Sequence, residues 1–288
     1  MKKLAPYLLS VPQILLGMLF LTGLITGITQ SLGVIPVFGL EEATLDYYKE
    51  VFAKPDMLRS VLYSLYIAFA SAGLSTVAGV LICMVLVSAG KTKGKMMRVV
   101  QIPIVVPHVV VAIFVINILS QNGLLARAAY MLGLISEQQD FPMLIYDPGG
   151  IGVILAYLWK EIPFIIYFVI GLMASIDGRL GEAAVNLGAG RLASFVRVTL
   201  PLCMPSILSG FLIIFVFALG AYELPALLGA TAPKALPVLA YIQYTHPDLK
   251  NRPYAMALNG IIIAISLLSA VVYFLLVKKN SQILKEKR

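Results

Sequence analysis

Charged side chains are scarce in this sequence of 288 residues. Asp, Glu, Lys and Arg together make up 12% of the chain, 60% of its residues are hydrophobic, and the mean hydropathy is +0.92. Soluble domains carry about 25% charged residues, so this shortage excludes an ordinary soluble enzyme. The excess of apolar residues excludes an intrinsically disordered chain. The remaining class is a protein embedded in a membrane.

Cysteine and histidine are also too few for most site chemistry. Cys83 and Cys203 lie in apolar stretches without metal or redox spacing, and we expect them to be small core residues. His108 and His246 are too far apart in sequence to suggest a ligand cluster. The sequence contains no Gly-x-x-x-x-Gly-Lys-Ser/Thr phosphate loop. We therefore expect no catalytic residue, no metal site and no cofactor bound by this chain itself.

Six long apolar runs dominate the sequence. They occupy about residues 5–30, 58–89, 99–120, 151–176, 204–229 and 254–277. Each is long enough for a transmembrane helix, which needs about 20 apolar residues. The first run is too long for the core of a signal peptide and is not followed by a good cleavage site, so we expect an uncleaved span. The prediction is an all-α membrane protein in which residues 1–288 form a single transmembrane domain.

The net charge of +8 is explained by the orientation of these spans. Arg and Lys collect in cytoplasmic loops because they resist translocation. If the N-terminus is inside, the inside segments 1–4, 90–98, 177–200 and 278–288 hold 14 basic and three acidic residues. The outside segments hold seven basic and nine acidic residues. This asymmetry predicts that both termini are cytoplasmic, and it gives no reason to expect nucleic-acid binding.

Residues 177–200, between the fourth and fifth spans, form an inside connection much longer than antiparallel helices usually need. Several small or apolar residues recur in it at three- and four-residue spacing, which places them on one face of a helix. These residues are Leu180, Ala183, Ala184 and Leu187. A cytoplasmic helix with small side chains on its contact face suits docking to another protein. A helix that lies on the lipid surface is the alternative.

The ends of this helix also have sequence signals. Asp177 is an expected N-cap, and Gly188 is expected to end the helix in the left-handed conformation. A second short helix should follow, and we expect Pro201 and Pro205 to stop it. The segment is thus predicted to be two short helices, separate from the spans on either side.

The same segment resembles a motif of the membrane subunits of binding-protein-dependent ABC importers. The family pattern is Glu-Ala-Ala, three residues, Gly, nine residues, Ile, one residue and Leu-Pro. This chain has Glu182-Ala183-Ala184, Gly188, Val198 and Leu200-Pro201 at the same spacing, with Val in place of Ile. Residues 159–164, Trp-Lys-Glu-Ile-Pro-Phe, also resemble the family.

The resemblance implies a type I ABC importer permease, a multi-pass protein of the prokaryotic inner membrane with a cytoplasmic coupling helix. Such a transporter has a second permease subunit (we favour a heterodimer over a homodimer) and a cytoplasmic ABC ATPase dimer, which hydrolyses ATP with Mg. An extracytoplasmic solute-binding protein delivers the solute. The residues implied to couple to the ATPase are Glu182, Ala183, Ala184, Gly188, Arg191, Leu200 and Pro201. Arg191 and Arg197 could instead face anionic membrane lipid.

Polar groups within the spans are candidates for the translocation path, since charges there are costly and are functional hypotheses by default. Glu223, in the outer part of the fifth span, would favour a cation; an ordinary ion pair near the interface is the alternative. Lys160 and Glu161 point about 100° apart on a helix, and a structural role is favoured for this pair. The candidate path residues are Glu223, Tyr222, Tyr157, Glu161, Asn117 and Asn259.

The third span contains two prolines four residues apart, Pro103 and Pro107, which predict a bend. His108 directly follows the second proline. We expect this histidine to be a satisfied residue of helix packing rather than a ligand.

The fifth span bears on the substrate. Residues 222–229, Tyr-Glu-Leu-Pro-Ala-Leu-Leu-Gly, resemble the importer branch that handles polyamines, ferric iron, sulfate-like oxyanions, phosphonates or thiamine. Within that branch Glu223 favours a polyamine such as spermidine or putrescine, and the other solutes are the alternatives. A secondary transporter driven by an ion gradient would need more mid-membrane ionisable groups or an inverted repeat. An intramembrane enzyme would need a catalytic cluster, and a purely structural subunit would not need the motif.

Overall fold

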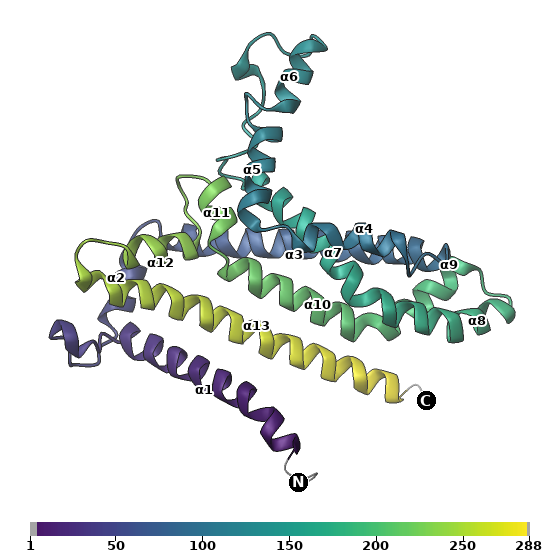
Figure 1. The fold of residues 1–288 in the computed structure, drawn as a ribbon, viewed down its shortest axis with the longest axis horizontal. Coiled ribbons are helices and arrows are strands. Elements are labelled where there is room, and N and C mark those ends of the chain that lie inside the picture. The colour runs from purple at the N-terminus through teal and green to yellow at the C-terminus, as the bar shows by residue number, and fades with distance from the viewer. Residues whose placement is uncertain (1–4, 287–288) are drawn as a thin grey trace. The chain divides into compact units, whose positions relative to one another are not determined.

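The computed structural model describes residues 5–286, and the side chains of residues 9–278. Helices account for most of this range (Figure 1). The α-helices are α1 (Ala5–Ser31), α2 (Asp46–Ala53), α3 (Met57–Ser88), α4 (Lys95–Val105), α5 (His108–Leu119), α6 (Leu124–Met131), α7 (Ile151–Ile176), α8 (Glu182–Asn186), α9 (Arg191–Ser194), α10 (Leu200–Gly220), α11 (Glu223–Leu228), α12 (Leu236–Tyr244) and α13 (Arg252–Glu286). Lys2, Lys3, Lys287 and Arg288, which contribute to the predicted orientation, lie outside the described residues.

Six helical segments are long and apolar enough to cross a membrane. They are Leu9–Ser31, Met57–Ser88, His108–Met131, Ile151–Asn186, Arg191–Gly220 and Leu249–Lys278. Many large apolar side chains on these segments are exposed on the chain, as is expected where lipid is the solvent. The prediction of an all-α protein with six spans is therefore confirmed. The orientation of the termini remains a prediction.

The chain divides into two compact units, residues 1–58 with 236–264, and residues 59–235 with 265–288. In the first unit, the tyrosines of α2 pack on the start of α13. The rings of Tyr47 and Tyr254 meet edge to face with centroids 5.0 Å apart, and the Tyr254 hydroxyl donates to the Glu50 carboxylate. The Tyr48 hydroxyl donates to Ser31 Oγ at 2.9 Å. These contacts tie the segment between α1 and α3 to two spans.

The second unit is built around α7, which packs against α4 and α10 (Figure 1). Ile165, which is fully buried on α7, lies where two neighbouring helices carry glycine. A Cβ on Gly79 of α3 would lie 2.6 Å from Ile165 Cγ2, and a Cβ on Gly210 of α10 would lie 2.9 Å from Ile165 Cδ1. Both distances are far below van der Waals contact, so α3 and α10 approach α7 closely because these positions lack side chains.

The third predicted span, residues 99–120, is two helices rather than one bent helix. α4 ends at Val105 and α5 begins at His108, with Val106 and Pro107 in extended conformations between them. Proline has no N–H to donate and forces the preceding residue out of the helical region, which accounts for a full break at this position. Pro103 lies inside α4 without ending it.

The fifth predicted span, residues 204–229, also contains a break. α10 starts earlier, at Leu200, and ends at Gly220; Ala221 is extended and the separate helix α11 follows. A continuous helix would require the Pro225 nitrogen to donate to the Ala221 carbonyl, which proline cannot do. Because both pieces are apolar, the hydropathy of the sequence predicted them as one span.

The close approach at Gly79 gives a first prediction. Gly79→Ala should lower the midpoint of thermal unfolding in detergent by about 3 °C, because overpacking at Ile165 costs about 1–3 kcal/mol and exceeds the gain in helix propensity. The control is Gly73→Ala on the same helix, where a Cβ would meet nothing within 4 Å. This control should raise the midpoint. Equal increases in both variants would contradict the described α3–α7 contact.

Candidate functional site

The first arm of the 177–200 segment continues the fourth span. α7 runs through a π-helical turn at Asp177–Gly181 directly into α8, and the backbone stays helical from Ile176 to Glu182. The predicted N-cap at Asp177 is therefore wrong, because no helix begins there. The carboxylate of Asp177 instead accepts a hydrogen bond of 3.1 Å from the Thr199 hydroxyl.

The second arm continues into the fifth span in the same way. α9 passes through a π-helical turn at Phe195–Thr199 into α10. Pro201 and Pro205 therefore do not stop this helix, contrary to prediction. In the π-helical turn the Leu200 N–H donates to the Phe195 carbonyl, five residues earlier. Pro201 follows directly after this π-helical turn, as the second residue of α10.

A tight turn joins the two arms. Gly188 has a φ of +94°, which confirms the predicted left-handed end of the helix. The Gly188 N–H donates to the Val185 carbonyl at 2.9 Å, and the Ala189 N–H donates to the Ala184 carbonyl at 3.0 Å. This pair of bonds satisfies carbonyls that the helix end would otherwise leave free. Residues 177–200 thus form a helical hairpin, which we call the coupling hairpin.

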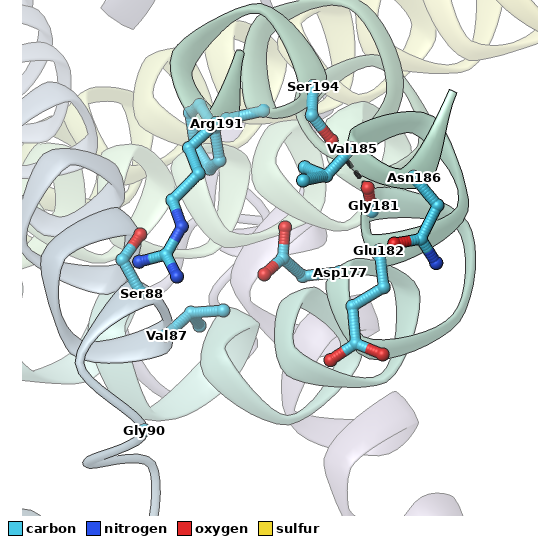
Figure 2. A pocket seen from close by; sticks show the side chains of 11 residues that line it. Val87, Ser88, Gly90, Asp177, Gly181, Glu182, Val185, Asn186, Arg191 and Ser194 are labelled. Atoms are coloured by element: carbon cyan, nitrogen blue, oxygen red, sulfur yellow. Dashed lines mark hydrogen bonds between the residues drawn. The ribbon is translucent and has the colours of Figure 1, made fainter. Parts of the chain in front are cut away.

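Two side-chain bonds hold the arms of the coupling hairpin together. Besides the bond between Thr199 and Asp177, the Ser194 hydroxyl donates to the Gly181 carbonyl at 3.0 Å, as Figure 2 shows. Gly181 is buried, and a Cβ there would lie 2.7 Å from Asp177 Oδ1. Sequence reasoning missed these bonds, because they become apparent only once the two arms are known to lie side by side.

A pocket of about 340 Å³ lies between the coupling hairpin and the end of α3. Its lining includes Glu182 from the first arm, Arg191 from the second and Ser88 from α3. In Figure 2 the Arg191 guanidinium lies beside Ser88, and the Asp177 carboxylate points into the space between the elements. The hairpin therefore carries charges of both signs around one concave surface.

Most of the predicted coupling residues are accessible. Glu182, Ala183, Gly188 and Arg191 are exposed, and Ala184 is half-buried. Leu200 and Pro201 are half-buried at the start of α10, away from the turn. The apolar residues of the tip are strongly exposed: Leu187 keeps 90% and Leu192 67% of its surface accessible. Exposed apolar residues grouped in this way are typical of a surface that another molecule covers.

A second cavity, of about 250 Å³, lies at mid-span between α4, α5, α7 and α10. Two of the predicted path residues, Tyr157 and Glu161, line it, together with His108, Lys160 and Phe217. Tyr157 is fully buried, and its hydroxyl donates to the Ala218 carbonyl at 3.5 Å. The lining is aromatic and apolar except for these few polar groups.

Glu161 belongs to the packing of α7 against α3. It is 4% exposed and accepts a hydrogen bond of 3.0 Å from the Ser75 hydroxyl. Its other oxygen, Oε1, has no hydrogen-bond partner among the described residues. A buried carboxylate satisfied on one side only is costly.

His108 and Glu223 come together although 115 positions separate them in sequence. His108 Nδ1 lies 3.4 Å from Glu223 Oε2, and the imidazole packs against the Phe217 ring with centroids 5.3 Å apart. The prediction that His108 serves only helix packing is therefore incomplete. Glu223 begins α11 and is about half exposed, and Tyr222 directly precedes it. The carboxylate is thus near the cavity through His108.

Asn117 and Asn259 are not among the residues that line this cavity. Asn117 is exposed on α5, where its side-chain amide donates to the Ile113 carbonyl at 2.8 Å. Asn259 is exposed on α13, in the other unit. Within residues 5–286, no three His, Cys, Asp or Glu side chains lie together as a metal would require.

Comparison with known proteins identifies a family model and several relatives. The family model described as "Binding-protein-dependent transport system inner membrane component" matches residues 73–282. The spermidine/putrescine permease protein PotB of Haemophilus influenzae is 32% identical over 156 residues, which cover 54% of this chain and 52% of PotB. The putrescine permease protein PotI of Escherichia coli is 24% identical, with 83% and 80% covered. The molybdate/tungstate permease protein WtpB of Pyrococcus abyssi is 28% identical, with 82% and 86% covered.

Two solved structures share the fold. A bacterial alginate ABC transporter, in complex with an alginate pentasaccharide-bound periplasmic protein, contains a chain with a TM-score of 0.75 and 19% identity, covering 94% of this chain and 93% of its own. The methionine ABC transporter MetNI in an inward-facing conformation gives a TM-score of 0.57 at 19% identity, with 78% and 96% covered. At such identities the likeness concerns the fold alone.

The turn of the coupling hairpin gives a second prediction. Gly188→Ala should speed hydrogen–deuterium exchange of the amides in the 184–190 turn, because a non-glycine residue at positive φ costs about 1–2 kcal/mol. Gly190→Ala is the matched control, since its φ is −65° and a Cβ there meets nothing within 4 Å. Faster exchange in both variants alike would show that the left-handed turn is not the cause.

Proposed function

Because this chain belongs to the family of binding-protein-dependent transport system inner membrane components, we propose that it lines the translocation path of an ATP-driven importer and couples that path to a separate ATPase. Members of this family are non-catalytic subunits, and the six apolar helices fit a multi-pass inner-membrane protein. The chain performs no covalent chemistry in this proposal. ATP and Mg are bound and hydrolysed by the partner ATPase.

The observation that carries the proposal is the coupling hairpin. It extends two spans into a rigid, cross-linked tip whose apolar residues are exposed and whose smallest residues, Ala183, Ala184 and Gly188, allow close approach of another backbone. Its basic residues fit a cytoplasmic location. We propose that Glu182, Ala183, Ala184, Gly188 and Arg191 contact the ATPase dimer. Leu200 and Pro201 support them from the start of α10.

The proposed assembly contains two further protein partners. One is a second permease subunit, and we favour a heterodimer. The other is an extracytoplasmic solute-binding protein, and the related alginate transporter was solved with a periplasmic protein bound. Both termini would then be cytoplasmic. An interaction with anionic lipid remains the alternative for Arg191 and Arg197.

For the substrate we propose a polyamine. The names of PotB and PotI, and the Glu223 carboxylate near an aromatic cavity, support a cationic solute. Tyr157, Glu161, Tyr222 and Glu223 would contribute to its path, whereas Asn117 and Asn259 would act elsewhere along it. The name of WtpB supports the alternative of an oxyanion. Ferric iron, phosphonate and thiamine are the other candidates.

Co-purification of Glu182→Lys gives a third prediction. From native membranes in mild detergent, the wild-type chain should carry an ATPase and a solute-binding protein, identified by mass spectrometry. Reversal of the charge on the exposed first turn of α8 should reduce ATPase recovery about tenfold or more, since hot-spot residues of interfaces contribute about 2 kcal/mol. Glu42→Lys, also exposed but in the segment before α2, is the control and should retain the ATPase.

The reverse outcomes are informative as well. An ATPase retained by Glu182→Lys at the wild-type ratio would contradict the docking role of the coupling hairpin. Wild-type chain purified without any ATPase would favour the gradient-driven transporter instead.

Glu223→Gln gives a fourth prediction, which concerns the substrate class. Loss of the negative charge should raise the KM for uptake of labelled spermidine about tenfold, the effect of one charge-assisted hydrogen bond. Glu42→Gln is the control and should leave uptake unchanged. An unaltered KM in Glu223→Gln would mean that this carboxylate serves only its contact with His108.

A further inference from the structure

Lys160 lies in the middle of α7, and its ammonium group binds backbone oxygens of another helix. It donates to the Val106 carbonyl and, at 3.4 Å, to the Ile104 carbonyl. These two carbonyls lie at the break between α4 and α5, where no following helical N–H is available to them. Unpaired carbonyls within a membrane cost several kcal/mol each, so the lysine supplies the donors that the broken helix lacks.

The electrostatics of the break favour a cation at this point. The C-terminal end of a helix carries partial negative charge, and α4 ends at Val105, beside the ammonium group. A lysine within a span is costly unless it is paired in this way. Its neighbour Glu161 does not provide the pairing, because that carboxylate points to Ser75 on α3. Two successive residues of α7 therefore bond to two different elements.

Lys160 also shares a helix with the coupling hairpin. The helical backbone is continuous from Ile151 to Asn186. At 1.5 Å per residue, Glu182 lies about 33 Å along this helix from Lys160. The side-chain bonds between Thr199 and Asp177 and between Ser194 and Gly181 hold the far end of the helix to the second arm. Lys160 and the first arm of the hairpin therefore belong to one continuous helical segment.

Beyond the break, the chain reaches His108. This residue begins α5 and lies 3.4 Å from the Glu223 carboxylate. Lys160 therefore contacts the break, and the residue that follows the break contacts Glu223.

We propose that Lys160 is a positioning residue that transmits movement of the coupling hairpin to the α4–α5 break, and through His108 to Glu223. The proposal rests on the proposed function, in which the hairpin docks on an ATPase. In this proposal the break is a hinge between α4 and α5, and the ammonium group of Lys160 holds that hinge against α7. Lys160 itself does not need to contact the solute.

The test uses the transporter complex purified from native membranes. ATP hydrolysis is measured in the complex without its binding protein, and again after the co-purified binding protein is added back with whatever ligand it carries. Lys160→Met retains the length and apolar stem but removes the ammonium group. It should keep the ATPase bound and keep basal hydrolysis, but lose about fivefold or more of the stimulation by the binding protein, a typical coupling effect. Lys160→Arg should restore most of the stimulation. Lys95→Met, which alters an exposed lysine of α4, should behave as wild type.

The outcomes separate this proposal from the proposed function. Absence of an ATPase from the wild-type preparation would refute the function itself. Normal stimulation in Lys160→Met, with the ATPase bound at the wild-type ratio, would overturn the proposal alone. Loss of basal and stimulated hydrolysis together would also overturn it, because a merely structural residue would act in that way. If Lys160→Met does not accumulate in membranes, Lys160→Leu, which also lacks the ammonium group, undergoes the same comparison and is judged by the same outcomes.

Discussion

The close packing of α7 against its neighbours is the constraint on which the second unit depends. The Ile165 side chain fills the space left by Gly79 on α3 and Gly210 on α10, so three spans pack closely around this one side chain. In lipid, helices gain nothing from hydrophobic burial against one another, and close approach of this kind is what holds them together. Because α7 is fixed in this way, its polar residues are brought to defined partners, and its C-terminal end continues as one arm of the coupling hairpin.

The polar groups of α7 follow from the same arrangement. Within an apolar environment each polar group must find a partner in the protein, and those of α7 find theirs on different elements. Glu161 bonds to α3, Lys160 to the break between α4 and α5, and Tyr157 to α10. These bonds specify how the helices are rotated relative to one another, which apolar packing alone specifies poorly. They also place a cavity with few polar groups beside the pair of His108 and Glu223.

Hydropathy and spacing predicted the six spans and the left-handed turn at Gly188, because both depend on local sequence. They predicted that Gly220 and Pro225 loosen the fifth span but kept residues 204–229 as one span, and they did not predict the continuity of the hairpin arms with α7 and α10. A hydropathy window averages over a break between two apolar pieces, and prolines such as Pro201 stop a helix only where their missing N–H is needed. The pairing of His108 with Glu223 could not be predicted, since it arises only when α5 and α11 meet in the folded chain.

The two π-helical turns have a consequence for insertions and deletions. Each such turn amounts to one extra residue in an α-helix, and the chain carries one in each arm, at Asp177–Gly181 and at Phe195–Thr199. Deleting one residue would convert that turn into regular α-helix and rotate everything beyond it by about 100°. The arms share their cross-links and their pocket only while both extra residues are present. The length of the chain between the spans is therefore fixed in two places, one in each arm.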